Sequence, residues 1–541
     1  MWLINTSTIM LERANPDDLS STPYAILSHT WGAEEVTFDE VINQSQSNDS
    51  SGYVKIVNTC RLAKERGLAY AWVDTCCIDK RSSAELAEAI NSMFRWYKQA
   101  AVCFAHLEDL PSVAQGEEFD PFELKSCKWF TRGWTLQELI GPKNLEFYDC
   151  AWHFRGTKTD LGDLISSTTG IDIQVLKDGS ILESIPIARR MSWAAGRKTT
   201  RIEDMAYCLL GIFDVNMPML YGEGAKAFER LQEEIIKQTT DMSIFAWKAK
   251  DNSQDFRGIL AESPDEFAHC GSLCRAPSMR HGFETTMTNK GLRLKTFLAD
   301  GHALDLACLL PNEFYAPRIG VFLTKTADGY VRSKPTELLE ATDSRLWAGA
   351  RYKIFVRKRV TAFVSKKLKE DLMKNLSVRL DICPTFKVHT FAAKPADLWD
   401  EHRHQFIVSG NKNFTGFLDF QISNESGSFV SDRIIVVCGH SVEYTTPSGW
   451  TAKLLLTRDA RNMPESKLVM GNIYGYYNSH GEEYFLHDLG NALPLLQDKY
   501  YSRREIDIPS KWSKHTRSGC ILINLENRTD GILVSVKDEG N

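Results

Sequence analysis

Short apolar runs alternate with segments of helical spacing over the first 150 residues of the chain. Apolar runs bounded by turn residues are typical of buried strands, whereas apolar residues three and four positions apart are typical of one helix face. The runs predict strands at residues 24–28, 68–74, 101–107 and 144–149. The spacing predicts helices at residues 54–66, 82–97 and 131–140. Because each pair of strands is separated by enough chain for a crossover, we expect one parallel sheet with flanking helices.

The predicted sheet also indicates where a ligand would bind. We expect strand 24–28 to pair with strand 101–107 in the same sheet. Open parallel sheets bind their ligands in the crevice at the carboxyl ends of the strands. The side chains that follow these strands are therefore the first place to look for chemistry.

Two capping boxes mark expected helix starts. Ser82 is followed three residues later by Glu85, and Thr200 is followed by Glu203 at the same spacing. In this arrangement each side chain can cap the backbone amide of the other residue. The expected apolar face of the second helix comprises Ile202, Met205 and Leu209, and a further helix would bury Phe228, Leu231 and Ile235. A helical extension to about residue 245 should thus follow the sheet.

Beyond the polar stretch at residues 248–254 the pattern changes to alternation with period two. Eight β-branched or aromatic runs predict strands at residues 291–299, 302–310, 318–326, 350–358, 414–423, 432–440, 451–458 and 519–525. Such runs, spaced by Gly, Pro, Asn and Asp, are typical of antiparallel sandwiches or barrels. We therefore expect an α/β domain over residues 1–248, with its core at about 20–150, and a β-rich region over 255–541.

Composition and charge narrow the class of protein. The chain has 541 residues, of which 43% are hydrophobic and 25% charged, and this balance is typical of a globular protein with about two to four domains. The 64 Lys and Arg against 70 Asp and Glu give a net charge of −6, which disfavours a dedicated nucleic-acid binder. No apolar run reaches the about 18 residues that a membrane span needs, and the first residues do not resemble a signal peptide. The 13 cysteines are then expected to be reduced thiols in a cytoplasmic protein.

Three polar clusters follow the first three predicted strands. They are the segments at residues 28–32 (SHTWG), 74–80 (DTCCIDK) and 129–139 (WFTRGWTLQEL). In the third cluster, Trp134 and Glu138 are four residues apart and would share one face of a helix. An indole beside a carboxylate can desolvate and position it for catalysis. The alternative is a core Trp134 and a solvated Glu138.

Five ordered motifs identify a family resemblance. YAILSHTWG, AWVDTCCIDK, SAELAEAINSMFRWY, WFTRGWTLQELIGP and the segment from RMSWAAGRKTTRIED to AFERLQEEI closely resemble the fungal heterokaryon incompatibility (HET) domain family, over about residues 20–245. HET domains in turn look like distant relatives of Toll/interleukin-1 receptor (TIR) domains, whose fold is flavodoxin-like. The resemblance implies a role in fungal non-self recognition and programmed cell death.

The resemblance also implies an activity. In TIR enzymes that cleave NAD, the catalytic Glu lies on the helix after the third strand in a W-x3-E context, which Trp134 and Glu138 match. It implies Glu138 as the catalytic residue, with Ser28, His29, Trp31, Asp74, Asp79 and Trp134 as candidate walls of the NAD site. NAD would be the substrate, and no other cofactor and no metal are expected. The Cys76-Cys77 pair and the His29-Thr30-Trp31 turn depart from the wider TIR pattern.

Other interpretations of these residues stay open. The chain can be a non-catalytic signalling module that self-associates, with a protein partner at the β-rich region. A homo-oligomer on activation fits both this interpretation and the enzymatic one.

Cys76 or Cys77 with His29 could form a thiol nucleophile and base. Residues 222–227 match the dinucleotide fingerprint G-x-G-x-x-A, but no convincing strand precedes them. Zinc ligation by His269, Cys270 and Cys274, or by His402 and His404, lacks a properly spaced second pair and is disfavoured. The basic run at residues 366–369 is expected to be a solvated face.

Overall fold

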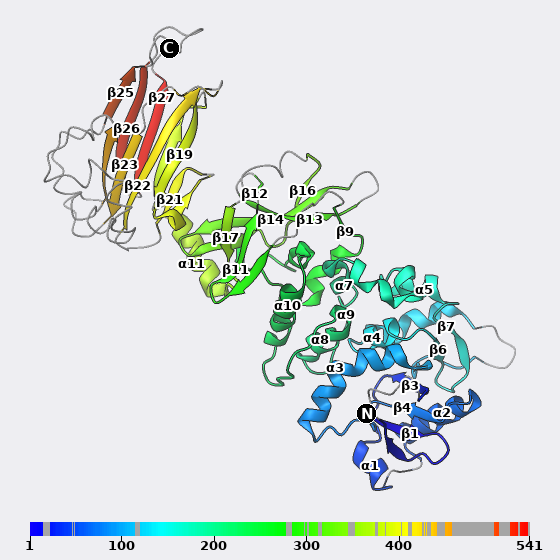
Figure 1. The fold of residues 1–541 in the computed structure, drawn as a ribbon. Helices are drawn as coiled ribbons and strands as arrows, with labels where there is room; N and C mark the ends of the chain where they lie inside the picture. The colour runs from blue at the N-terminus through cyan, green and yellow to red at the C-terminus, as the bar shows by residue number, and fades with distance from the viewer. Residues whose placement is uncertain are drawn as a thin grey trace.

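The chain forms an α/β unit followed by two β units (Figure 1). The computed structural model describes residues 1–14, 22–113 except 46 and 48, 119–276, most of 284–343, 352–373, most of 377–440, 450–456, 503–507, 520–528 and 531–538. The α/β unit contains the N-terminus, and the last β unit contains the C-terminal strands.

A seven-stranded mixed sheet forms the centre of the α/β unit, in the order β2-β1-β4-β3-β5-β6-β7. Its strands are β1 Trp2–Asn5, β2 Leu11–Arg13, β3 Tyr24–His29, β4 Tyr70–Trp72, β5 Val102–His106, β6 Leu145–Tyr148 and β7 Phe154–Thr157. Strands β4, β3, β5 and β6 are mutually parallel, and Leu27 of β3 lies opposite Phe104 of β5. The predicted parallel core and the pairing of its first and third strands are therefore confirmed. Strand β1 and the edge strands β2 and β7 pair antiparallel with their neighbours and were not predicted. In β2 and β7 the charged residues Glu12, Arg13 and Arg155 interrupt any apolar run.

Helices pack around this sheet. They are α1 Phe38–Ile42, α2 Ser51–Glu65, α3 Ser83–Gln99 and α4 Thr135–Ile140, with 3-10 turns at Pro121–Ser126 and Lys128–Thr131. Helix α2 packs against β3 and β4, whereas α3 packs against α4. The Ser82 hydroxyl caps α3 by accepting from the Glu85 amide at 3.3 Å, as predicted. The Glu85 side chain instead accepts from the Asp79 amide at 3.1 Å, so the capping box is only half formed.

A layer of short helices follows the sheet. It comprises α5 Gly162–Thr169, α6 Ile173–Lys177, α7 Ile187–Ser192, α8 Asp204–Tyr207, α9 Leu210–Phe213 and α10 Lys226–Gln238, with 3-10 turns at Gly179–Ser184 and Met242–Phe245. The predicted capping box at Thr200 and Glu203 is wrong: α8 begins only at Asp204 and has no side-chain cap. Ile202, expected on the buried face, is 60% exposed. The tertiary contacts of Glu203 described below replace the local cap.

Two β units complete the chain. The first contains β8 Phe256–Arg257, β9 Cys274–Arg275, β10 Thr285–Thr288, β11 Gly291–Thr296, β12 Leu298–Ala299, β13 Ala303–Leu309, β14 Arg318–Thr326, β15 Gly329–Ser333, β16 Leu339–Ala341 and β17 Tyr352–Val356, with a 3-10 turn at Pro264–Cys270. Helix α11, Ala362–Met373, carries the basic run, and Lys366, Lys367 and Lys369 are exposed on it. The second contains β18 Ser377–Ile382, β19 Phe386–Lys394, β20 Trp399–Asp400, β21 Gln405–Ile407, β22 Phe414–Asn424, β23 Ile434–His440, β24 Trp450–Leu456, β25 Arg503–Asp507, β26 Cys520–Arg528 and β27 Gly531–Asp538, with a 3-10 turn at Ala396–Leu398.

The predicted β-rich C-terminal half is confirmed. Each of the eight predicted runs contains a strand, and nearly all pairings are antiparallel; the exceptions are β15 with β17 and β18 with β27. In the second unit a six-stranded and a four-stranded sheet share one apolar core, as in a sandwich. The core of the first β unit is continuous with that of the α/β unit, because one buried cluster extends from Leu3 to Val356.

A buried cation–aromatic contact lies where the α/β unit meets the first β unit. The Arg332 guanidinium of β15 stacks on the Trp247 ring at 3.6 Å and donates to the carbonyl oxygens of Phe245 and Trp247. Burial lowers the pKa of Arg332 to about 9, which still leaves it charged at neutral pH. The Lys248 and Ala249 amides also donate to backbone carbonyls of the β unit, each at 2.8 Å. The chain is thus held tightly up to residue 249.

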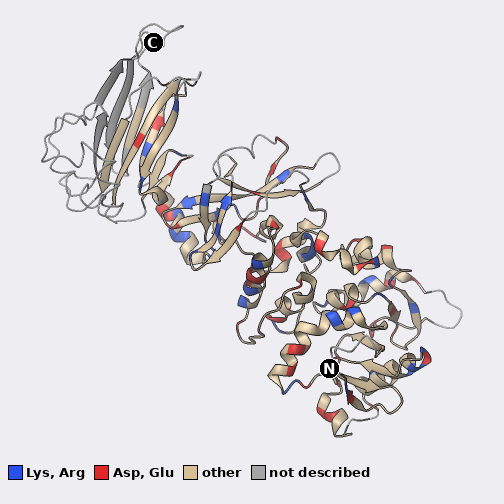
Figure 2. Cartoon of the chain, viewed as in Figure 1, with Lys and Arg blue, Asp and Glu red and all other residues tan. Residues whose placement is uncertain are grey.

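Charged residues of both signs are interspersed over the described part of the ribbon (Figure 2). Among the residues that the structure describes, no helix is both long enough and apolar enough to cross a bilayer.

Candidate functional site

A pocket of about 290 Å³ lies at the carboxyl ends of β3 and β4. Five of the seven predicted site residues line it: His29, Trp31, Asp74, Trp134 and Glu138. Ser28 lies directly behind Glu138, to which it is hydrogen bonded, whereas Asp79 is not part of the lining. The volume is at the lower end of the range for small-molecule sites. The pocket can therefore enclose one end of a dinucleotide.

Glu138 is buried at the wall of this pocket, with 5% of its surface exposed. The Trp129 indole donates to Ser28 Oγ at 2.8 Å, and the Ser28 hydroxyl donates to Glu138 Oε2. Burial raises the pKa of the Glu138 carboxyl to about 8; the hydrogen bond from Ser28 opposes the rise and the charge of Asp74 adds to it. The free protein thus holds Glu138 largely protonated at neutral pH.

The alternative of a solvated Glu138 beside a core Trp134 is wrong. All six residues of α4 are buried, because α4 packs against both β3 and α3. Trp134, the residue before α4, is partly buried and lines the pocket. The carboxylate and indole do share the pocket, as their four-residue spacing predicted.

Asp74 holds two aromatic side chains of the pocket in place. Its oxygens accept from the Trp31 indole at 2.8 Å and lie 3.0 Å from His29 Nε2. The Lys80 ammonium lies 4.0 Å above the Trp31 ring, whose side chain remains 49% exposed at the pocket mouth. Burial alone would raise the pKa of Asp74, but the hydrogen bond with His29, the charge of Lys80 and the indole of Trp31 together hold it below its ordinary value. Asp74 is therefore an ionised positioning group beside the protonated Glu138.

The opposite wall comes from a segment whose role the sequence did not reveal. Thr200, Arg201, Asp204 and Tyr221 line the pocket, although they lie well beyond the predicted sheet in sequence. The Tyr221 hydroxyl donates to Asp204 Oδ1 at 3.0 Å, and the Arg201 guanidinium stacks on the Tyr221 ring at 4.5 Å. The only signal in the sequence was the position of RKTTRIED and LYGEG within the family motifs.

Backbone contacts dock this segment against the start of α4. The Gly133 amide donates to the Lys198 carbonyl at 2.8 Å, and the Lys198 amide donates to the Thr131 carbonyl at 2.7 Å. The buried Arg197 donates to the Arg132 carbonyl at 2.9 Å and to Thr135 Oγ1 at 3.2 Å. A Cβ on Gly133 would come within 2.5 Å of a Thr199 methyl carbon, so this close approach requires glycine. The two walls of the pocket are thereby joined.

The glycine-rich fingerprint has a structural role. The amides of Gly222 and Gly224 both donate to Glu203 Oε1, at 2.8 and 3.0 Å. Both glycines have positive φ, +100° and +62°, and backbone amides that converge in such a turn form an anion-binding nest. A carboxylate of the chain itself fills this nest, and no strand precedes it. The segment therefore orients Tyr221 and does not bind a dinucleotide phosphate.

The cysteine alternatives also have structural explanations. Cys76 and Cys77 are buried, and a hydrogen bond with Cys77 and burial raise the pKa of Cys76 well above its ordinary value. His269 Nε2 lies 3.0 Å from the Ala246 carbonyl oxygen, so this ring nitrogen has a partner within the protein. No three His, Cys, Asp or Glu side chains in the described part of the chain form a group that could hold a metal ion. His402 lies outside the described residues.

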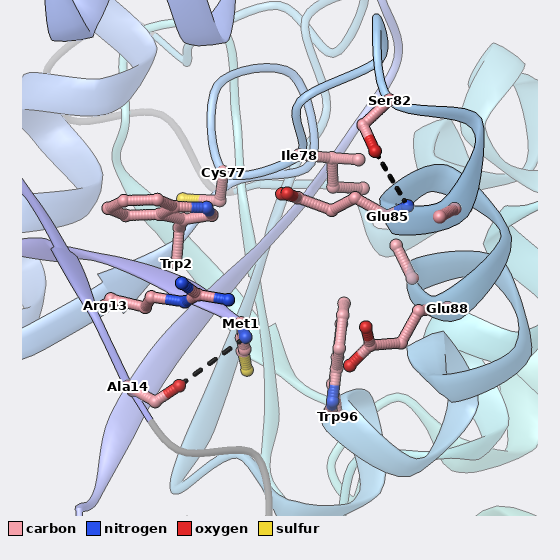
Figure 3. A pocket seen from close by; sticks show the side chains of 12 residues that line it. Met1, Trp2, Arg13, Ala14, Cys77, Ile78, Ser82, Glu85, Glu88 and Trp96 are labelled. Carbon is pink, nitrogen blue, oxygen red and sulfur yellow. Dashed lines mark hydrogen bonds between the residues drawn. The ribbon is translucent and has the colours of Figure 1, made fainter.

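A second pocket, of about 660 Å³, lies on the other side of Ile78, between the N-terminal strands and α3 (Figure 3). Trp2, Trp96, Glu85 and Glu88 line it, and none of the seven predicted site residues does. The Asp79 carboxylate is instead paired with its neighbour Arg81, at 2.9 and 3.0 Å. The structure thus separates Asp79 from the other six predicted residues.

Comparisons with known proteins give the α/β unit a family context. Residues 24–117 match the family model described as heterokaryon incompatibility protein (HET), and residues 226–257 match a domain of unknown function, DUF8212. Over 221 residues the chain is 48% identical to the vegetative incompatibility protein HET-E-1 of Podospora anserina. This segment is 40% of the chain, and it spans only 16% of the length of that relative. No solved structure matches.

Proposed function

We propose that this protein acts in heterokaryon incompatibility, as an effector of fungal non-self recognition and programmed cell death, and that its α/β unit cleaves the nicotinamide–ribose bond of NAD. The match at residues 24–117 and the identity to a vegetative incompatibility protein support the first part. The order β4-β3-β5-β6 supports a flavodoxin-like, TIR-like core, because the parallel strands then lie in the order second, first, third, fourth.

The observation that carries the enzymatic part is the buried Glu138 carboxyl in the pocket wall, fixed by Ser28 and Trp129. Cleavage breaks the bond between C1′ and the pyridinium nitrogen, and the electron pair leaves with that nitrogen, which becomes neutral. No general acid is needed for this departure. Water then adds to C1′ and gives up its proton to the solvent. A carboxylate hydrogen bonded to the ribose hydroxyls stabilises the oxocarbenium-like transition state in which the bond from C1′ to the nitrogen breaks.

The electrostatics of the pocket suit this substrate. The pyridinium of NAD carries a positive charge, and a positive charge close to Glu138 favours its ionised form. Substrate binding therefore converts a protonated carboxyl into the carboxylate that the reaction needs. The cationic side chains of Lys80, Arg132 and Arg201 line the same pocket and are suited to the diphosphate. Trp31 and Trp134 offer aromatic surfaces for the ring systems.

Nicotinamide release by the purified full chain tests the proposal. We expect Glu138→Gln to reduce kcat roughly 10²- to 10³-fold, because it removes a preorganised group that acts in the transition state. Glu183→Gln, an exposed carboxylate outside the pocket, is the matched control and should retain full activity. Full cleavage by a folded Glu138→Gln variant would refute the role of Glu138. If the wild type kills cells without cleaving NAD, the non-catalytic signalling module is correct instead.

The remaining parts of the proposal concern the cellular setting. The protein acts in the cytoplasm, assembles into a homo-oligomer on activation, and uses its β-rich region to regulate the α/β unit or to bind a protein partner. Size-exclusion chromatography with light scattering, before and after addition of NAD, tests the assembly.

A further inference from the structure

Asp204 is a buried carboxylate in the pocket that the proposed reaction does not use. It is 9% exposed and lines the pocket together with Trp134 and Tyr221. Burial raises its pKa, while hydrogen bonds with Tyr221 and Trp134 and the charge of Arg201 oppose the rise. A buried acidic group is costly to keep unless its remaining hydrogen-bonding capacity is used.

The position of Asp204 is fixed from several sides. Its Oδ1 accepts from the Tyr221 hydroxyl at 3.0 Å. The loop that carries Tyr221 is held by the Glu203 carboxylate through the amides of Gly222 and Gly224 and by the Leu220 amide, which donates to Tyr207 Oη at 2.9 Å. Tyr221 and Arg201 stack, which restricts both side chains. The wall is therefore preorganised without a ligand, as recognition of one chemical group requires.

Asp204 lies beside the aromatic side chains Tyr221 and Trp134 of the pocket wall and keeps part of its capacity to accept hydrogen bonds. Asp74 is engaged by His29, Trp31 and the nearby Lys80, and Glu138 is engaged by Ser28 and is held protonated. A carboxylate has about four lone-pair sites, and Tyr221 and Trp134 use two of them at Asp204. Asp204 can thus accept a further hydrogen bond from a ligand.

We propose that Asp204 is a specificity-determining residue that accepts a hydrogen bond from the carboxamide NH₂ group of the nicotinamide ring, with Trp134 and Tyr221 as the neighbouring aromatic walls. This inference rests on the proposed NAD cleavage. Trp134 precedes α4 and Glu138 lies one turn further along that helix, so a ring beside Trp134 places its ribose bond towards Glu138. The adenine end would then extend towards Trp31 and Lys80 at the pocket mouth.

The proposal predicts a preference between two nearly identical substrates. Nicotinic acid adenine dinucleotide has a carboxylate in place of the carboxamide, so it lacks the NH₂ donor and places a negative charge against Asp204. Leaving a buried acceptor without its hydrogen bond lowers affinity roughly tenfold to hundredfold. The wild type should therefore favour NAD by at least this factor in kcat/KM.

The test measures kcat/KM for NAD and for nicotinic acid adenine dinucleotide at pH 7.5. The proteins are the wild type, Asp204→Asn, Tyr221→Phe and the control Asp163→Asn. Asp163 also lies in the first turn of a helix but is exposed on α5, so it reports the effect of the substitution alone. Asp204→Asn should bring the two kcat/KM values within about threefold, mainly by raising KM for NAD. Tyr221→Phe, which keeps the ring, should reduce the preference partially, and Asp163→Asn should not change it.

Binding of free nicotinamide and nicotinate, measured by calorimetry, separates this proposal from the proposed reaction. Asp204-dependent preference for nicotinamide without any NAD cleavage would support the recognition role and refute the reaction. Cleavage that needs Glu138 but shows the same substrate preference in Asp204→Asn and the wild type would refute the role of Asp204. Equal use of both dinucleotides by the wild type would refute it as well.

Discussion

Replacing Glu138 by Gln should stabilise the protein, and the gain should grow with pH. The folded state holds the Glu138 carboxyl with a pKa of about 8, against an ordinary value of 4.5. Below pH 4.5 both the folded and the unfolded protein bind the proton, so the carboxyl costs nothing. Between the two values only the folded state binds it, and the stability of the wild type therefore falls as pH rises towards 8. Gln has nearly the same shape and stays neutral, so it avoids this loss.

The size of the effect follows from the pKa. Keeping a carboxyl with an ordinary pKa of 4.5 protonated costs about 1.4 kcal/mol for each pH unit above 4.5. At pH 7 the cost is about 3 kcal/mol in all. The same calculation gives about 1 kcal/mol at pH 5 and about 5 kcal/mol above pH 8. The Gln amide oxygen can still accept the hydrogen bond from Ser28. The expected gain is thus several times larger than that of an ordinary surface substitution.

Urea unfolding followed by tryptophan fluorescence measures this gain at pH 5, 7 and 8.5. Nine of the 13 tryptophans lie in the first 250 residues, so the signal reports mainly on the α/β unit. The exposed control Glu183→Gln should stay within about 0.5 kcal/mol of the wild type at each pH. A difference between Glu138→Gln and the wild type that stays constant over this range would refute the buried, protonated carboxyl.

Three further outcomes are expected. For nicotinamide release, kcat/KM should rise about tenfold per pH unit up to about pH 8 and then level off, because the free protein must ionise Glu138; a flat profile measured by chromatography would contradict this. Cys76→Ser should retain cleavage, and iodoacetamide at pH 7.5 should not inactivate the wild type, since the raised pKa of the buried Cys76 keeps its thiol protonated. Arg332→Met should lower the free energy of unfolding by about 2–6 kcal/mol, because the Phe245 and Trp247 carbonyls each lose a donor at about 1–3 kcal/mol apiece, and should speed trypsin cleavage between residues 248 and 254. An Arg332→Met variant as stable as the wild type would show that the buried guanidinium is not needed there.

Local patterns were sufficient for much of the fold. The four apolar runs before residue 150 form the parallel strands, and the eight alternating runs after residue 290 contain strands, because burial on one or both faces of a sheet imposes a period that is visible in any single sequence. The edge strands β2 and β7 contain charged residues, Glu12, Arg13 and Arg155, so no apolar run marks them in the sequence. The helix expected at Thr200 failed for another reason: Glu203 gains two hydrogen bonds from the loop at Gly222 and Gly224, and these outweigh a local cap.

For the candidate site too, one part could be predicted from the sequence and another part depended on the tertiary structure. The sequence by itself predicted that His29, Asp74 and Glu138 meet, because each lies at or beyond the carboxyl end of a strand of one parallel sheet and these ends share an edge. Only the tertiary structure decided that Glu138 is buried and protonated and that Asp204 and Tyr221 close the opposite wall. Burial and pKa depend on which distant segments dock over a side chain, and here that docking runs through backbone contacts of Lys198, which leave no periodic trace in the sequence.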